Sequence, residues 1–375
     1  MSSLDQISQV LFRDARTVIT VGAGGVGKTT CSIAIALLGA YQGKRVGLLS
    51  IDPAKRLAQA MGLGFSSKLT EVTLPSSFKG RGSLHAVMLD QKVVFDEMVL
   101  RFSPSETVAR KILDNKLYQV VSKNLGGPLE YMALAKLEKM VSGGEFDLVV
   151  LDTPPDTHAI DFMMRPNILS GFMENKVMTW LIKPFYLAQR FGVQKIFQAG
   201  ERMMGGVATV LGIKALNVVA EFLVLMEDVI SGFHRSGQAV VKIMRDPSTR
   251  FMLVTMPTPA AMRSTKHLAQ QLSEQGFALD TLVVNQMLPA SVTASLKTKL
   301  GSSSLQSSAL GMAIEQLRSR DAFATTLIAA LKHDIAVGNH QSFATVTIQE
   351  QDCMIHTVEA LAAMLATWQI DTRKG

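Results

Sequence analysis

Cysteine is scarce in this sequence, and its scarcity excludes two kinds of stabilised domain. The 375 residues contain only two cysteines, Cys31 and Cys353. One chain can therefore form neither a disulfide framework nor a zinc site with four thiolate ligands. Because free cysteine is among the most buried residue types, we expect both to be small apolar side chains of a core.

Long apolar runs are also missing. No uncharged apolar run approaches the roughly 18 to 20 residues that span a bilayer. The segment from Met1 to Thr17 is polar and mixed in charge, unlike a secretory signal. We therefore expect a soluble, cytoplasmic protein without a transmembrane segment. The net charge of +7 is modest for this length and fits an anionic ligand, an acidic partner, a membrane surface or simply a solvated surface.

What the sequence does have is a series of short apolar runs separated by helical patterns. Continuous apolar runs are typical of strands that are buried on both faces of a sheet. Strands that alternate with helices predict right-handed crossovers and a mostly parallel sheet flanked by helices, which is an α/β fold. The expected strands are Thr17–Val21, Val46–Ser50, His85–Leu89, Leu148–Asp152, Phe251–Thr255 and Leu282–Asn285.

Two stretches, about 93–140 and about 160–244, break this alternation and are helical in pattern throughout. We expect them to form an inserted helical subdomain. The second stretch is rich in methionine, which suits either an adaptable groove for apolar clients or ordinary filling of a core. Its methionines are Met163, Met164, Met173, Met178, Met203, Met204, Met226 and Met244.

The tail from Asp352 to Trp368 has the apolar spacing of a helix with one apolar face. A helix lying on a membrane surface would carry lysine and arginine on the opposite face. This tail offers Thr357, Glu359 and Gln369 there instead, so we expect it to pack on the sheet.

The first expected strand leads directly into the pattern G-x-x-x-x-G-K-T, which is followed by an apolar helical pattern. That order is typical of a phosphate-binding P-loop, in which glycines let backbone N–H groups curl around phosphate oxygens. The helix then directs its positive end at the same anion. We expect Lys28 to reach the β- and γ-phosphates and the Thr29 hydroxyl to bind Mg²⁺. The predicted nucleotide-binding residues are Gly22, Ala23, Gly24, Gly25, Val26, Gly27, Lys28, Thr29 and Thr30.

Two carboxylates follow expected strands, at the edge of a parallel sheet where ligands bind. Asp52 could orient or deprotonate a water aimed at the γ-phosphate, or it could be the N-cap of a helix. Asp152 ends the run LVVLD, the Walker B pattern, and is expected to hold Mg²⁺ directly or through water. We count Asp52 beside Lys28 as catalytic, and we place it with Thr29 and Asp152 around the metal.

The segment after Asp152 predicts a stiff turn that senses the γ-phosphate and moves when it is lost. The candidate switch residues are Pro53, Thr153, Pro154, Pro155, Asp156 and His158. Asp156 and His158 would otherwise be plain turn residues. Asn285 ends a late strand, where its amide could read the edge of adenine or serve only in a turn. The N-K-x-D motif expected of a GTPase is missing, which favours ATP.

Four segments carry a family resemblance. They are VGAGGVGKTT at 21–30, SIDPAKRLAQAMGL at 50–63, LVVLDTPPDTHAIDFM at 148–163 and LVVNQMLP at 282–289. With them the chain resembles the ArsA and guided-entry ATPases, members of a larger group of deviant P-loop proteins that includes MinD, ParA and the nitrogenase iron protein.

The resemblance implies a single ATPase domain over residues 1–375, with ATP and Mg²⁺ bound. By resemblance, Asp52 is the switch I carboxylate that positions the attacking water, and Asp152 lies in the Mg²⁺ sphere. The run from Thr153 to His158 resembles switch II, and Asn285 resembles the adenine reader. The family's helical subdomain falls where the methionine-rich stretches lie here.

The chain departs from the family at Ala23, where a second, signature lysine normally stands. In the family that lysine crosses a dimer interface to the partner's phosphates. The C-x-x-C pair that binds zinc between tail-anchor-targeting subunits is missing, as are the three cysteines that bind arsenite. Neither zinc-clamped delivery nor metalloid transport is therefore expected.

Three functions follow as hypotheses. The first is a Mg²⁺-dependent ATPase whose cycle opens and closes a homodimer, or a heterodimer with a paralogous ATPase, and so gates a helical surface for a hydrophobic protein or lipid client. The second is a nucleotide-dependent subunit of a hetero-oligomer with low turnover, suggested by Ala23. The third is a positioning ATPase like MinD or ParA, whose basic terminal helix this tail lacks. We expect no nucleic-acid partner.

Overall fold

The computed structural model of the chain describes residues 3–12, 14–51, 61, 68–78, 82–124, 129–153, 213–289, 291–294, 309–338, 342–352, 355 and 357–371. The chain divides into two compact units. The first unit comprises residues 1–89, 137–164 and 242–375, and the second comprises residues 90–136 and 165–241.

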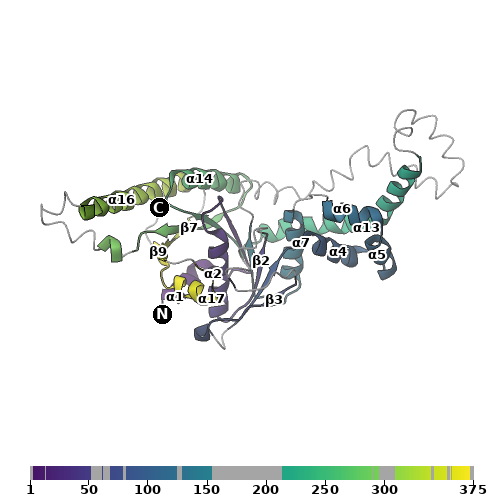
Figure 1. The fold of residues 1–375 in the computed structure, drawn as a ribbon, viewed down its shortest axis with the longest axis horizontal. Helices are drawn as coiled ribbons and strands as arrows, with labels where there is room; N and C mark the ends of the chain where they lie inside the picture. The colour runs from purple at the N-terminus through teal and green to yellow at the C-terminus, as the bar shows by residue number, and fades with distance from the viewer. Residues whose placement is uncertain are drawn as a thin grey trace. The chain divides into compact units, whose positions relative to one another are not determined.

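A nine-stranded sheet forms the centre of the first unit, in the order β3-β4-β2-β5-β1-β6-β7-β8-β9 (Figure 1). The strands from β4 to β8 in this order pair in parallel, and the edge strands β3 and β9 pair antiparallel to their neighbours. The bounds are β1 Thr17–Gly22, β2 Arg45–Ser50, β3 Thr70–Glu71, β4 Ser83–Met88, β5 Leu148–Asp152, β6 Thr249–Thr255, β7 Leu279–Met287, β8 Ala344–Gln349 and β9 Gln369–Asp371.

The mostly parallel α/β fold predicted from the sequence is confirmed, and all six expected strands are present. Strand β5 has the predicted bounds, and the others differ by at most three residues at either end. Three strands were not predicted. Strand β3 has two residues and β9 has three, which is too short for a pattern, and β8 carries alternating threonines that weaken its apolar signal.

Helices cover both faces of the sheet in the first unit (Figure 1). On one face, α2 (Lys28–Tyr41) lies between the strands, α1 (Ser3–Phe12) and α17 (Val358–Leu365). On the other face, α14 (Pro259–Glu274) packs on β6 and contacts the long α16 (Ala309–Gly338). A short 3-10 turn spans Ser76–Phe78.

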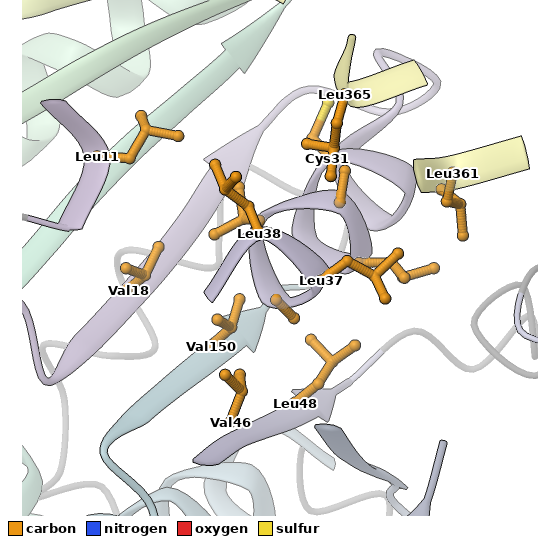
Figure 2. Packing of buried hydrophobic residues seen from close by; sticks show 14 of the residues in the cluster. Leu11, Val18, Cys31, Leu37, Leu38, Val46, Leu48, Val150, Leu361 and Leu365 are labelled. Atoms are coloured by element: carbon orange, nitrogen blue, oxygen red, sulfur yellow. The ribbon is translucent and has the colours of Figure 1, made fainter. Parts of the chain in front are cut away.

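Helix α2 is the centre of the hydrophobic core. In Figure 2 its side chains lie between strand residues such as Val18 and Val150 and the α17 residues Leu361 and Leu365. Apolar side chains all round the helix are typical of one that is buried on every side. The helix ends at Tyr41, two residues before Gly43, whose φ of 85° is left-handed.

The tail is only partly the helix that its apolar spacing predicts. Helix α17 begins at Val358, because the Thr357 hydroxyl accepts from the Ala360 N–H and caps it, and it ends at Leu365. Ile355 lies before the helix, and the chain turns after it into β9. The predicted helix from Asp352 to Trp368 is therefore wrong in its bounds, although Trp368 is buried in the core. The apolar run continues beyond the helix because the following turn and strand face the same core.

Replacing Leu361 by alanine should lower the free energy of unfolding of the first unit by about 2 to 5 kcal/mol, because it leaves a cavity beside α2. Leu361 is fully buried in the same core cluster as α2. Glu359→Ala in the exposed face of α17 is the matched control, with an expected change within about 0.5 kcal/mol. Chemical denaturation followed by a probe of the first unit measures both, and equal effects would contradict the packing.

The second unit is helical in its described residues. Its elements are α4 (Gln91–Phe102), α5 (Glu106–Leu113) and α6 (Lys116–Asn124), with most of α7 (Leu129–Ser142) and α13 (Ile213–Met244). The helical pattern predicted for 93–140 is thus confirmed over the described residues, 93–124 and 129–140. Of the second helical stretch, 160–212 lies outside the described residues. The role of these helices as a subdomain of one ATPase domain stays a prediction.

A compact apolar cluster holds the second unit together around Tyr118, Val99 and Met226. The Tyr118 hydroxyl donates to Asp96 at 2.7 Å, so this nearly inaccessible side chain has its polar atom satisfied. Met226 and Met244 are both buried, as core-filling methionines would be. The other six methionines of the stretch lie outside the described residues. Within the part of the chain that is described, no helix is long and apolar enough to cross a membrane.

Candidate nucleotide-binding site

The predicted phosphate-binding loop connects β1 to α2. Strand β1 ends at Gly22 and α2 begins at Lys28, with Gly25 and Gly27 at φ of 78° and 91°. These left-handed angles suit glycine and allow the backbone to curl within a few residues. Because Gly27 precedes the helix and has no side chain, it cannot cap the N–H groups of the first turn. These groups can therefore bind an anion.

Lys28 lies within the loop rather than in solvent. Its side chain is buried, and Nζ donates to the carbonyl oxygens of Gly22 and Ala23, each at 2.8 Å. The ammonium group is thus held across the loop that should surround the phosphates. A cation that is held in place before the phosphate binds attracts it more strongly than a mobile surface lysine would. Ala23 is partly buried and packs against the core, and its methyl side chain supplies no charge.

Asp152 is a fully buried carboxylate. Its Oδ2 accepts from the Ser50 hydroxyl at 2.8 Å, its Oδ1 accepts from the Ser32 hydroxyl at 3.1 Å, and the Thr29 side chain also bonds to it. Burial raises the pKa of Asp152 above its usual value, while the hydroxyl donors oppose that rise. These donors come from α2 and β2, two elements that flank β5 and its carboxyl end.

Further hydroxyls extend this network across the sheet. The oxygens of Thr20 and Ser32 lie 2.7 Å apart, and the Thr153 hydroxyl donates to the Thr20 carbonyl at 2.7 Å. Thr153, a predicted switch residue, is therefore tied to β1 beneath the loop. The sequence reasoning missed Thr20, Ser32 and Ser50. The position of Ser32 one turn after Lys28 was a usable signal, because residues four apart share a helix face.

Asn285 reaches the loop from the end of β7. Its Nδ2 donates to the Val26 carbonyl at 3.0 Å, and its Oδ1 accepts from the Gln286 N–H at 2.9 Å. A primary amide has two donor hydrogens and two acceptor lone pairs, so one of each remains for a base. The structure therefore brings together the loop, Lys28, Thr29, Asp152, Thr153 and Asn285, all of which the sequence singled out.

Comparison with known proteins identifies the family. Residues 15–331 match the family model described as anion-transporting ATPase. The chain belongs to this family. It is 28% identical over 271 residues to ATPase ASNA1 homolog 1 of Paramecium tetraurelia, covering 71% of this chain and 73% of that protein. It is 28% identical over 280 residues to ATPase asna-1 of Caenorhabditis elegans, covering 71% and 73%. It is 26% identical over 271 residues to ATPase GET3 of Malassezia globosa, covering 71% of each chain.

As a member of this family the chain is an enzyme that hydrolyses ATP, and the resemblance seen in the four sequence segments is confirmed. Family membership does not test the individual residues. Several of these lie outside the described residues of the ATPase, so their roles stay predictions. They are Asp52, Pro53, Pro154, Pro155, Asp156 and His158.

The oxygen atoms of the site suit Mg²⁺, the metal that the family implies. Mg²⁺ prefers oxygen ligands and is usually held by one or two carboxylates, waters and substrate phosphates. The ATPase offers the Asp152 carboxylate and the Thr29 hydroxyl side by side. Among the described residues, no group of three or more histidine, cysteine, aspartate or glutamate side chains forms a closed metal cage. An open set of two oxygen ligands fits a metal that arrives with the nucleotide.

Cys31 lies behind the loop and should be chemically inert. Burial, together with the nearby Asp152 charge, raises the pKa of its thiol to about 12. At pH 8 a thiol with that pKa is ionised to only about one part in ten thousand. In a Cys353→Ser variant we therefore expect no reaction of the folded protein with a disulfide reagent at pH 8. Full reaction should occur in denaturant, and labelling of the folded protein at the denatured rate would contradict the burial.

Proposed function

We propose that this ATPase binds the triphosphate of ATP against the loop from Gly22 to Thr29 and hydrolyses it with Mg²⁺. The observation that carries the proposal is the meeting of a buried ammonium group, Lys28, with a buried carboxylate, Asp152, at the start of α2. A cation facing the phosphates and a carboxylate facing the metal are the two charges that phosphoryl transfer requires.

Each residue then has a separate task. The loop N–H groups and Lys28 bind the phosphate oxygens and stabilise charge as it develops. Thr29 and Asp152 would hold the metal, which when bound neutralises charge on the β- and γ-phosphates. The resemblance gives Asp52 the task of orienting the attacking water. Asn285 would read the edge of adenine with the donor and acceptor that it has left.

The buried hydroxyls support this arrangement by fixing the carboxylate. Ser32 and Ser50 each donate to a different oxygen of Asp152, which leaves its orientation little freedom. Residues that hydrogen-bond a metal ligand commonly affect metal affinity by about 10- to 100-fold. The segments after β2 and β5 contain the predicted switch residues, and both strands end in this network.

We further propose that the ATP cycle opens and closes a dimer and thereby gates a client-binding surface on the second unit. A nucleotide can shift such an equilibrium only if it binds one state more tightly than the other. Switch segments beside the γ-phosphate provide that difference. The client would be a hydrophobic protein or a lipid, held by the methionine-rich stretch.

Ala23 favours a second candidate, a subunit of a hetero-oligomer that binds nucleotide but turns it over slowly alone. Ala23 has no charge to offer a partner's phosphates, and its side chain packs against the core. In this case a paralogous subunit with the signature lysine would supply the missing cation.

Steady-state hydrolysis and light scattering of the purified chain separate these candidates. Magnesium-dependent turnover, with a dimer in a non-hydrolysable ATP analogue and a monomer or altered dimer in ADP, supports the first. Tight nucleotide binding without turnover supports the second. Binding to anionic vesicles or duplex DNA in ATP, lost at moderate salt, would instead indicate a positioning ATPase.

A further inference from the structure

Asn285 makes a contact with the phosphate-binding loop that adenine recognition alone does not require. Asn285 Nδ2 donates to the carbonyl of Val26, which lies inside the loop, two residues before Lys28. A residue that only reads the base needs no bond to the loop. This one ties the end of β7 to the backbone that should surround the phosphates.

The geometry of the Val26–Gly27 peptide bond determines which way the Gly27 N–H points when Asn285 holds the Val26 carbonyl. The Val26 carbonyl and the Gly27 N–H belong to one planar trans peptide unit, so they point in opposite directions. When the carbonyl is held toward Asn285, the Gly27 N–H points away from Asn285. If this peptide unit rotated, the Val26 carbonyl would no longer point toward Asn285, and the Gly27 N–H would no longer point away from it.

Two local features of the structure accommodate the hydrogen bond between Asn285 and Val26. A Cβ atom on Gly27 would come within 2.3 Å of Asn285 Nδ2, so only glycine leaves room for the amide. Beyond Asn285, Gln286 has a φ of 60°, and the pairing of β7 with β8 shifts register between Val284 and Met287. A left-handed angle at a residue other than glycine is uncommon and is kept where surrounding contacts hold it. Here the Gln286 N–H donates to Asn285 Oδ1, which fixes the orientation of the amide.

We propose that Asn285 is a positioning residue for the phosphate-binding loop, holding the Val26–Gly27 peptide so that the Gly27 N–H faces the phosphates, independently of any base. The inference rests on the proposed function, because it assumes that the loop binds the triphosphate. It assigns Asn285 two tasks, one toward the loop and one toward the base. Loss of its side chain therefore weakens ligands that have no base at all.

Binding of inorganic tripolyphosphate and of ATP, both with Mg²⁺, separates these tasks in a calorimetric titration of the full chain. Asn285→Leu keeps much of the volume and removes both polar atoms, and Asn285→Ala is made beside it in case leucine prevents folding. Melting temperatures confirm that each variant tested is folded. Gln286→Gly is the matched control, because it changes the adjacent exposed side chain and tolerates the left-handed φ.

We expect Asn285→Leu or Asn285→Ala to weaken tripolyphosphate by about tenfold, which corresponds to about 1.4 kcal/mol, and ATP by at least as much. Gln286→Gly should bind both ligands like the wild type. If the folded variants bind tripolyphosphate like the wild type and lose affinity only for ATP, the positioning role is wrong and base reading remains. If the wild type binds neither ligand, the proposed function itself fails, and the inference fails with it.

Discussion

Replacing Lys28 by alanine is expected to lower the kcat for ATP hydrolysis by about 100- to 1000-fold. The side chain is buried, and Nζ is held 2.8 Å from the Gly22 and Ala23 carbonyls, within the loop that should surround the phosphates. The alanine variant loses the cation that this position supplies, and water that enters in its place stabilises the charge less well. Steady-state kinetics give kcat and KM for both proteins.

Lys44→Ala is the matched control for this variant. Lys44 precedes β2, at the amino end of the parallel strands and hence at the opposite edge of the sheet from the loop. Its removal should change kcat by less than about twofold, as expected for a surface substitution away from the site. Wild-type turnover by a folded Lys28→Ala protein would refute its role in catalysis.

Replacing Asp152 by asparagine is expected to change activity and stability in opposite directions. The variant keeps the size of the side chain and loses its negative charge. We expect kcat to fall by about 100-fold or more and the half-saturating Mg²⁺ concentration to rise by about tenfold or more, because the carboxylate would hold the metal. A titration of activity against Mg²⁺ at saturating ATP measures both quantities.

The stability effect follows from the direction of the pKa shift. Burial raises the pKa of Asp152 above its ordinary value of 3.8, so the folded protein binds this proton more tightly than the unfolded chain does. Below the ordinary pKa both states are protonated and the shift has no effect. As the pH rises through the interval up to the folded pKa, the unfolded chain releases its proton first and the stability falls.

Asparagine cannot ionise and avoids that loss. Without nucleotide or metal, Asp152→Asn should therefore melt at a higher temperature than the wild type at pH 7, with the difference shrinking as the pH falls toward the ordinary pKa of 3.8 and vanishing below it. The melting temperature of each protein across this pH range is the measurement. A variant that melts lower than the wild type at pH 7 would show that the hydroxyl donors outweigh the burial of the charge.

The sequence predicts those parts of the fold whose signals are local. Strand β5 is a continuous apolar run with a carboxylate at its end, and its bounds were predicted without error. The left-handed Gly43 marks the end of α2 in the same way. Strand β8 was missed because its threonines interrupt the apolar pattern, and the tail helix was overextended because Trp368, in the turn after α17, is buried in the same core.

The chemistry of the site was predicted only in part, for a different reason. The P-loop pattern locates Lys28 and Thr29 because the whole motif is contiguous in sequence. Ser50 and Thr20 are ordinary strand residues until the strand order β2-β5-β1 places them on either side of Asp152. Periodicity does not determine strand order, so the hydroxyl network could not be found from it.

Asn285 was predicted in part from a local signal, but its contact with the loop depends on strand order. Its place at the end of an apolar strand indicated a ligand contact. Its bond to Val26 depends on the neighbouring positions of β1, β6 and β7 and on an irregular turn at Gln286. A structure was needed to see that the Asn285 side chain bonds to the loop.

The central claim is that the loop from Gly22 to Thr29 binds the triphosphate of ATP. Calorimetric titration of the full chain with ATP and Mg²⁺ tests it most directly. We expect saturable heat with one site per chain, weakened by at least about tenfold in Lys28→Ala, since that variant loses a charge-assisted contact. An absence of heat with the folded wild type, or equal affinity in the two proteins, would contradict it.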